Sequence, residues 1–336
     1  MNKIVERKYL IGISLIAILT ILAVENPLTS KYVTSLKQTG FEVSYSVDDL
    51  RMIIEEEADK RRADPQDAKI DPVWKATPGY NGVMIDVKAS LNKMKKDKTF
   101  DEDKLVYKQI SPKVHLADLP SSPIYRGHPD KPMASLIINV AWGNEYIPDM
   151  LATLKKHHVY ATFFLEGRWV QHNPEMAKMI VDAGHEVGNH SFSHPNMEIL
   201  SSAKVKEEIQ KTSQMIKATT GEEVKWFAPP SGSYRDEVVK IADNLNLKTI
   251  MWSVDTIDWQ KPDPQILIDR VMRKMHKGAI VLMHPTASTA NALNSLILQI
   301  KDREIRLGTV TSLLKEERIV TNSNNSTQQG NVKSNH

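Results

Sequence analysis

Two histidines four residues apart, His190 and His194, are the strongest local signal for chemistry in this sequence. They lie in the segment HEVGNHSFSHPN, which begins as a short strand-like stretch. A neutral imidazole is a good ligand for zinc and similar ions, and side chains four apart on a helical turn point the same way. The pair could hold one metal ion, although with 11 histidines in 336 residues such a spacing also arises by chance.

The surrounding residues 131–318 indicate how these histidines are positioned. Strand-like segments such as ASLIINVA, YATFFLEG and AIVLMHP alternate with amphipathic helical segments. About seven such alternations predict parallel strands joined by crossover helices, either as a doubly wound sheet or as a barrel. In both folds the functional site lies at the carboxyl ends of the strands, and the histidine pair follows one of those ends.

Three further segments complete a recognisable order: WFAPPSGSY, WSVDTIDW and IVLMHP. With the first strand and the histidine segment, they resemble the polysaccharide deacetylase (NodB-homology) domains of carbohydrate esterase family 4. Among these, the chain looks most like the sporulation-associated group of spore-forming bacteria. The resemblance covers residues 133–316 in five separated blocks. It implies an α/β fold, a distorted (β/α) barrel of about seven parallel strands, which periodicity alone could not choose.

The resemblance also implies a reaction. A divalent metal, usually zinc, is held by two histidines and one aspartate, where it activates water and polarises the acetamide carbonyl. A second aspartate acts as the base, and a histidine protonates the leaving amine. A backbone N–H helps to hold the oxyanion. The implied partner is a cell-wall glycan, either peptidoglycan or a related N-acetylated polysaccharide, and the products are an amino sugar and acetate.

Several positions match the residues that perform these roles in the family. His190 and His194 match the metal histidines, His284 matches the general acid, and Asp258 matches the carboxylate that orients that acid. The positions that match the substrate groove, including the turn that supplies the oxyanion N–H and the apolar residue beneath the acetyl methyl, are Pro229, Pro230, Ser231, Gly232, Trp259 and Leu282.

Three positions depart from the family pattern. The paired aspartates that normally precede the glycine, one a base and one a metal ligand, are replaced here by Ala141 and Trp142 before Gly143. The arginine that normally pairs with the base is replaced by Ala228. The loss of the arginine is consistent with the loss of the base aspartate. A buried arginine left without its carboxylate would destabilise the fold by roughly 3–5 kcal/mol. A general base contributes about 10²–10⁴ in rate, so we expect strongly reduced deacetylation.

Three interpretations of the chain follow. In the first, it remains a metal-dependent deacetylase in which Glu145, two residues past Gly143, or Asp255 supplies the missing carboxylate. In the second, it keeps the groove as a glycan-binding or scaffold protein at the cell or spore surface. In the third, residues 26–130 form a stalk that binds a partner, and the barrel has only a structural role. The simpler interpretation of Glu145 is a solvated glutamate at a helix N-terminus, and Asp255 could be a turn aspartate.

Composition and the chain termini limit location and partners. The net charge of +3 is too small to suggest a nucleic-acid partner, and the absence of cysteine excludes disulfides, thiolate catalysis and Cys-ligated zinc. Residues 1–25 place Lys3, Arg7 and Lys8 before an uncharged apolar run. This pattern predicts a signal peptide or, because no clean cleavage site follows, an uncleaved membrane anchor with the rest of the chain outside the cytoplasmic membrane.

The remaining segments have no chemical motif. Residues 26–71 are polar and charge-rich and are expected to form a stalk with a short helix. Residues 72–130 contain two strand-like stretches and a helical pattern, and are expected to form a small accessory module. Residues 319–336 are polar and low in complexity, which predicts a disordered tail.

Overall fold

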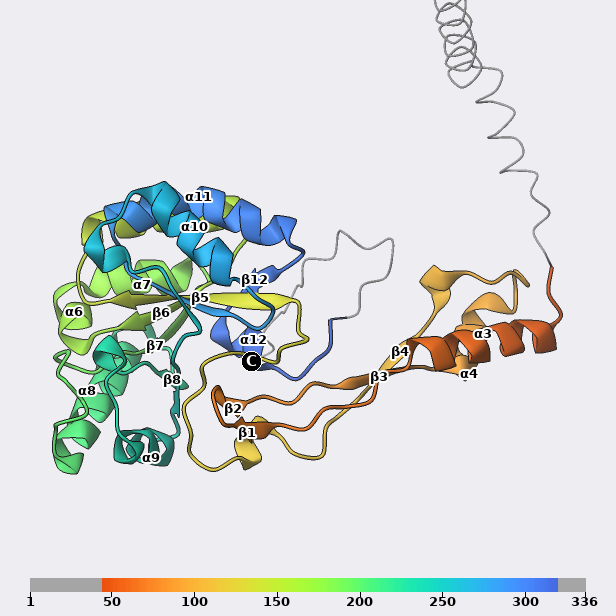
Figure 1. The fold of residues 1–336 in the computed structure, drawn as a ribbon, viewed down its shortest axis with the longest axis horizontal. Coiled ribbons are helices and arrows are strands. Elements are labelled where there is room, and N and C mark those ends of the chain that lie inside the picture. Colours follow the sequence, from red (N-terminus) through yellow and green to blue (C-terminus); the bar gives the residue numbers. More distant parts are fainter. Residues whose placement is uncertain (1–43, 320–336) are drawn as a thin grey trace, which may run out of the picture. The chain divides into compact units, whose positions relative to one another are not determined.

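The computed structural model describes residues 44–319, which divide into two units. The smaller unit contains residues 44–60 and 85–106, and the larger contains residues 61–84 and 107–319 (Figure 1). The predicted signal or anchor over residues 1–25 and nearly all of the predicted tail lie outside the described residues. Within residues 44–319, no helix is both long enough and apolar enough to span a bilayer.

The smaller unit is built on two helices, α3 (Val47–Arg61) and α4 (Val87–Met94), and a short 3₁₀ turn, η1 (Glu102–Lys104). The side chain of Ser46 begins α3 by exchanging hydrogen bonds with Asp49, and the Asp86 carboxylate accepts the backbone N–H of Ala89 at the start of α4. Leu50 and Ile54 of α3 are fully buried. Part of the expected stalk is therefore a packed helix, because its apolar residues recur four apart.

The larger unit includes segments that the sequence suggested were separate from the barrel. These are β1 (Lys69–Asp71), β2 (Lys75–Thr77), most of β3 (Gly82–Ile85), β4 (Tyr107–Ile110) and the turn η2 (Leu116–Asp118). Ala76 and Ile124 are buried in the same apolar cluster as Ile137 and Ile250 of the barrel. The unit boundary therefore differs from the expected module of residues 72–130, because parts of that segment complete the barrel core.

A parallel sheet of eight strands forms the framework of the larger unit. Its order is β10-β11-β5-β6-β7-β8-β9, and β12 pairs with the beginning of β5. The strands are β5 (Met133–Val140), β6 (Thr162–Leu165), β7 (Glu186–Asn189), β8 (Trp226–Phe227), β9 (Lys248–Thr249), β10 (Val254–Asp255), β11 (Ile280–Met283) and β12 (Arg306–Gly308). The predicted α/β fold on parallel strands is confirmed. In the described residues β9 and β10 are not paired with each other, so the barrel is open.

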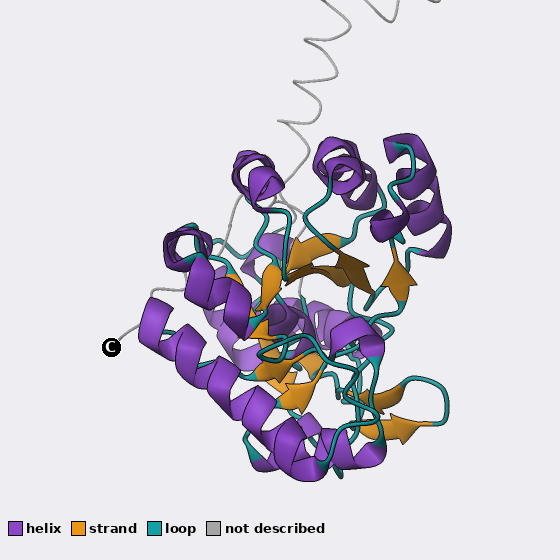
Figure 2. Ribbon diagram, turned by 90° about the vertical axis from the view of Figure 1, so that its left-hand side faces the viewer, coloured by secondary structure: helices purple, strands orange, loops and turns teal. Residues whose placement is uncertain are grey.

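Helices surround this sheet, as Figure 2 shows for the purple elements around the orange strands. They are α5 (Ile147–Lys156), α6 (Gly167–His172), α7 (Pro174–Asp182), α8 (Ser202–Thr220), α9 (Asp236–Asn244), α10 (Pro264–Lys274), α11 (Ala287–Asp302) and α12 (Val310–Leu314). All eight residues of β5 are buried. A strand that is covered on both faces needs the near-continuous apolar sequence that β5 has.

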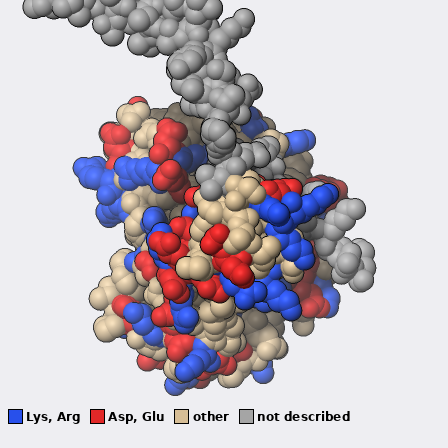
Figure 3. Space-filling view, turned by 90° about the vertical axis from the view of Figure 1, so that its right-hand side faces the viewer, with Lys and Arg blue, Asp and Glu red and all other residues tan. Residues whose placement is uncertain are grey.

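Charged side chains of both signs are interspersed on the face of the described residues that Figure 3 shows. A nucleic-acid-binding surface would instead gather lysine and arginine on one face. This view agrees with the small net charge of the sequence.

Glu186, at the start of β7, connects α12 to the sheet through hydrogen bonds. Its carboxylate accepts hydrogen bonds from Thr162 Oγ1 at 2.6 Å and from Trp226 Nε1 at 3.0 Å. It also accepts the hydroxyl and the backbone N–H of Thr311 in α12. One carboxylate thus satisfies donors from three separate elements. Removing it would leave the Thr162 and Thr311 donors without this acceptor, while Trp226 Nε1 would keep Thr311 Oγ1 at 3.0 Å.

We therefore predict that Glu186→Ala lowers the free energy of unfolding by about 2–4 kcal/mol, because several donors lose their acceptor at once. Urea denaturation followed by circular dichroism measures this change. The exposed Glu222→Ala is the matched control and should change stability by less than about 0.5 kcal/mol. Equal, small effects of both substitutions would contradict the role assigned to Glu186.

Candidate functional site

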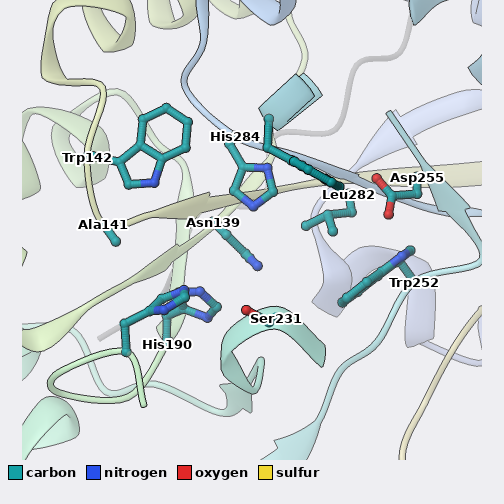
Figure 4. A pocket seen from close by; sticks show the side chains of 11 residues that line it. Asn139, Ala141, Trp142, His190, Ser231, Trp252, Asp255, Leu282 and His284 are labelled. Atoms are coloured by element: carbon teal, nitrogen blue, oxygen red, sulfur yellow. The ribbon is translucent and has the colours of Figure 1, made fainter. Parts of the chain in front are cut away.

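A pocket of about 430 Å³ opens at the carboxyl ends of the parallel strands (Figure 4). This size suits a small ligand or one unit of a polymer. The residues that line it come from the ends of β5, β7, β8, β9, β10 and β11 and the loops that follow, namely Asn139, Ala141, Trp142, His190, His194, Ser231, Trp252, Asp255, Trp259, Leu282 and His284. The structure thus brings residues from several of the predicted motifs together at the strand ends.

His190 is held in one tautomer by the backbone. The residue is 1% exposed, and its Nδ1 lies 2.8 Å from the carbonyl oxygen of Ala228. A carbonyl can only accept, so Nδ1 carries the proton and Nε2 is left unprotonated. Burial lowers the pKa of His190 to about 3. The neutral ring, with one nitrogen fixed by a hydrogen bond, is the form in which histidine binds metals.

His194 lies beside His190, with ring centroids 5.1 Å apart and planes at 71°. The loop that carries both rings is strained, since Ser191 and His194 have left-handed φ angles of 61° and 55°. Glu208 of α8 holds this loop by accepting the backbone N–H groups of Phe192 and Ser193 at 2.9 and 2.8 Å. Left-handed backbone at non-glycine residues persists only where the surroundings impose it, and such positions cluster at functional sites.

His284 and Asp258 form a second fixed pair. Asp258 begins the 3₁₀ turn η5 (Asp258–Gln260) and is fully buried. Its Oδ1 lies 2.8 Å from His284 Nδ1, while its Oδ2 accepts the backbone N–H of His284 at 2.5 Å and the hydroxyl of Thr289 at 2.6 Å. The carboxylate therefore orients the imidazole and leaves Nε2 as the exchangeable nitrogen. The structure brings this pair together as the sequence predicts, and its role in proton transfer stays a prediction.

Of the six predicted groove residues, Ser231, Trp259 and Leu282 line the pocket, whereas Pro229, Pro230 and Gly232 are not among its lining residues. Pro229 precedes the turn η4 (Pro230–Gly232), in which Ser231 has a left-handed φ of 54° and lines the pocket. A side chain on Gly232 would approach Trp252 to 2.7 Å, so the turn requires glycine there. Trp259 and Leu282 also line the pocket, and Trp259 is 58% exposed.

The positions that lack the family's charged residues are occupied by apolar groups. Ala141 and Trp142 both line the pocket. The Trp142 ring is stacked on His284 with centroids 6.0 Å apart and planes at 8°, and the residue remains 48% exposed. Ala228 is buried in the apolar cluster beneath the pocket, with Phe164, Ile250 and Leu282 among its members. No charged side chain therefore stands at these three positions, and the indole of Trp142 lies against the ring of His284, the predicted general acid.

The two candidate substitute acids differ in location. Glu145 lies in the 3₁₀ turn η3 (Asn144–Tyr146), is exposed, and is not among the pocket residues. Asp255 does line the pocket, but its Oδ1 accepts the backbone N–H of Ile257 at 2.8 Å in a tight turn. The structure thus brings Asp255 to the site and leaves Glu145 outside it.

The donor set does not fit the three-ligand metal site of a catalytic zinc centre. Such a site takes three protein ligands and one water. Across residues 44–319, no group of three His, Cys, Asp or Glu side chains is arranged to hold one ion. His190 and His194 supply two nitrogens, and the third ligand that the resemblance implies is replaced at the Ala141–Trp142 position.

Two pocket residues were not identified from the sequence, Asn139 and Trp252. Asn139 is the one strongly polar residue near the end of the apolar strand β5, two residues before Ala141. Side chains two apart on a strand point to the same face, and this spacing was the available signal. Trp252 follows the short strand β9, and nothing in its local sequence separates it from a core tryptophan.

Comparison with known proteins agrees with this geometry. Residues 126–250 match the family described as polysaccharide deacetylase. The chain is 50% identical over 296 residues to YlxY of Bacillus subtilis, an uncharacterised protein, and the match covers 88% of this chain and 93% of that one. It is 32% identical to a peptidoglycan-N-acetylglucosamine deacetylase of Bacillus cereus, over 51% of this chain and 64% of the relative.

A solved structure is similar over most of the described residues. It is described as a CE4 family pseudoenzyme from Bacillus anthracis, with 58% identity, a TM-score of 0.77, and coverage of 80% of this chain and 96% of that one. A mutant of that pseudoenzyme, 57% identical to this chain, is described as having restored enzymatic activity.

The buried state of His190 has a consequence for stability. Its pKa of about 3 lies below the ordinary 6.5, so below pH 6.5 the unfolded chain binds a proton that the folded chain does not. Stability is therefore lost as pH falls. We predict that His190→Asn makes the fall of unfolding free energy between about pH 6 and pH 4.5 shallower by about 1 kcal/mol per pH unit.

Urea denaturation at a series of pH values measures this slope. The exposed His172→Asn is the matched control and should leave the slope as in the wild type. Some slope should persist in His190→Asn, because burial also lowers the pKa values of His128 and His185 to about 4. A slope unchanged by His190→Asn would show that His190 is not held neutral by the fold.

Proposed function

Because the chain belongs to the polysaccharide deacetylase family of carbohydrate esterase family 4, we propose that it binds an N-acetylated glycan of the peptidoglycan type and releases little or no acetate from it. The observation that carries this proposal is the lining of the pocket, where Ala141 and the exposed Trp142 stand at the positions of the missing carboxylates. The protein is deacetylase-like in fold and pocket, with the groove kept and the machinery for attack incomplete.

Hydrolysis of an acetamide needs an activated water and an acid for the leaving amine. The His284–Asp258 pair supports the acid half, since Asp258 holds the ring through Nδ1 and leaves Nε2 for the amine. The water-activating half lacks a base and a third metal ligand. Asp255 is the one pocket carboxylate, and a backbone N–H engages one of its oxygens. Loss of a base alone reduces rates by about 10²–10⁴.

The binding half of the proposal rests on the walls of the same pocket. Trp142, Trp252 and Trp259 all line it, and Trp142 and Trp259 are 48% and 58% exposed. Exposed aromatic rings in a pocket present flat apolar faces with a polar edge, which suit the flat faces of sugar rings. The name of the Bacillus cereus relative, a peptidoglycan-N-acetylglucosamine deacetylase, favours peptidoglycan over other glycans.

We place this activity outside the cytoplasmic membrane, at the cell wall or spore, because the sequence of residues 1–25 has a basic start and an apolar run. Protease treatment of intact cells tests the location. Digestion of the chain is expected, and full protection in cells whose membrane is intact would contradict it.

Zinc is the metal we expect to bind His190 and His194. Its affinity should be weak, because a charged ligand is missing.

We predict that restoring the charged positions restores catalysis. Acetate release from acetylated chito-oligosaccharides and from peptidoglycan is measured for the full chain at known zinc content. Wild type should match His190→Ala. The triple variant Ala141→Asp, Trp142→Asp and Ala228→Arg should exceed it by at least about 10²-fold. The arginine is introduced together with the aspartates because Ala228 is 1% exposed, and a lone buried cation would destabilise the barrel.

Robust acetate release by the wild type that disappears in His190→Ala would overturn the proposal and establish a working deacetylase. In that outcome Asp255→Asn identifies the base, because Asp255 is the carboxylate that lines the pocket. The restored activity described for the mutant Bacillus anthracis pseudoenzyme supports the design of this experiment.

A further inference from the structure

Asn139 is a buried amide without a hydrogen-bond partner for its oxygen. The residue is 4% exposed, on a strand whose neighbouring residues Ile137, Ile138 and Val140 are fully buried and apolar. In the described chain, seven buried side-chain polar atoms lack a partner, and Asn139 Oδ1 is the one whose residue lines the pocket. A buried polar group left unsatisfied destabilises a fold by about 1–3 kcal/mol, and such a group in a native fold needs an explanation. Among the described residues the amide nitrogen Nδ2 of Asn139 has no hydrogen-bond partner either, so its N–H groups are available to a ligand in the pocket.

The side chain is aimed into the pocket. Figure 4 shows the Asn139 amide pointing into the space that His190, Ser231 and Leu282 surround. Alternation along β5 places Asn139 on the same face as Ala141. Beneath Asn139 lies the apolar barrel interior, which includes Ile137, Leu282 and Ala228. A leucine would suit the strand pattern and that layer better than an amide does.

The chemistry around Asn139 fits a secondary amide. An asparagine side chain carries a donor end and an acceptor end. A trans acetamide presents its carbonyl and its N–H on opposite sides, with a methyl beside the carbonyl. The Asn139 donor can bind the carbonyl oxygen, the buried Leu282 can contact the methyl, and the unprotonated Nε2 of His190 or the hydroxyl of Ser231 can accept the N–H.

We infer that Asn139 is a specificity-determining residue that donates its amide to the acetyl carbonyl of the bound glycan, so that the pocket recognises the N-acetyl group without a metal ion. This inference rests on the proposed function and specifies which side chain recognises the acetamido group of the glycan. Donation of the amide N–H to the ground-state carbonyl contributes to affinity whether or not the acetamide is cleaved. Hydrolysis would in addition need an activated water, and the positions of the base and the third metal ligand are occupied by Ala141 and Trp142.

The test compares chitotetraose with cellotetraose, two neutral oligosaccharides that differ at the acetamido position. Calorimetry with the full-length chain in EDTA should show that wild type binds chitotetraose at least about fivefold more tightly, as one well-made hydrogen bond allows. Asn139→Leu should bind chitotetraose as weakly as cellotetraose while its affinity for cellotetraose is unchanged. Its melting temperature should stay equal or rise, because an unsatisfied buried group has been removed.

Ser135→Ala is the matched control. Ser135 is also a buried polar residue on β5 with an unpartnered oxygen, but it does not line the pocket. This variant should keep the full preference for chitotetraose. If Asn139→Leu does not fold, Asn139→Asp removes the NH₂ donor at nearly the same volume, and should also lose the preference.

Each outcome has one meaning. A wild type that binds both oligosaccharides equally overturns the inference while the proposed glycan binding stands. A wild type that binds neither overturns both. A preference that survives in both Asn139→Leu and Asn139→Asp, or one that EDTA abolishes in the wild type, assigns acetyl recognition to other groups and contradicts the inference.

Discussion

The parallel pairing of β5 between β11 and β6 is the constraint on which the site depends. Ile137 pairs with Leu282 of β11 and with Thr162 of β6, which fixes the register of the strand on both sides. Because the register is fixed and side chains alternate along a strand, Asn139 and Ala141 face the pocket just beyond the level of Ile137 and Leu282, where His284 follows the end of β11. A slip of one residue would turn both away from it.

The retained parts of the site are held by contacts that do not involve the missing carboxylates. A backbone carbonyl fixes His190, so any residue at position 228 supplies the same acceptor. Glu208 secures the loop of His194, and Asp258 with Thr289 secures His284. This independence explains how the chain can keep an ordered pocket after losing the groups that attack the acetamide. Glycan binding can therefore persist without hydrolysis, because the contacts that order the pocket do not involve the residues that would activate water.

The sequence predicted the strands, the helices and most of the site, since long apolar strands, helical periodicity and the spaced motifs are local signals. It did not predict how residues 61–84 and 107–130 join the barrel, because the burial of Ala76 and Ile124 arises from tertiary contacts. Glu145 was a candidate by proximity along the chain, yet the turn η3 leaves it exposed. Asn139 and the stacking of Trp142 on His284 became apparent only when the strand ends were brought together.

The central claim is that this pocket holds an N-acetylated glycan without cleaving its acetamide. Mass spectrometry of chitotetraose recovered from the bound wild-type protein, after prolonged incubation with equimolar zinc, tests it most directly. We predict that all of the bound oligosaccharide keeps every acetyl group. Recovery of oligosaccharide that has lost an acetyl group, in amounts that grow with time and are absent with His190→Ala, would contradict it.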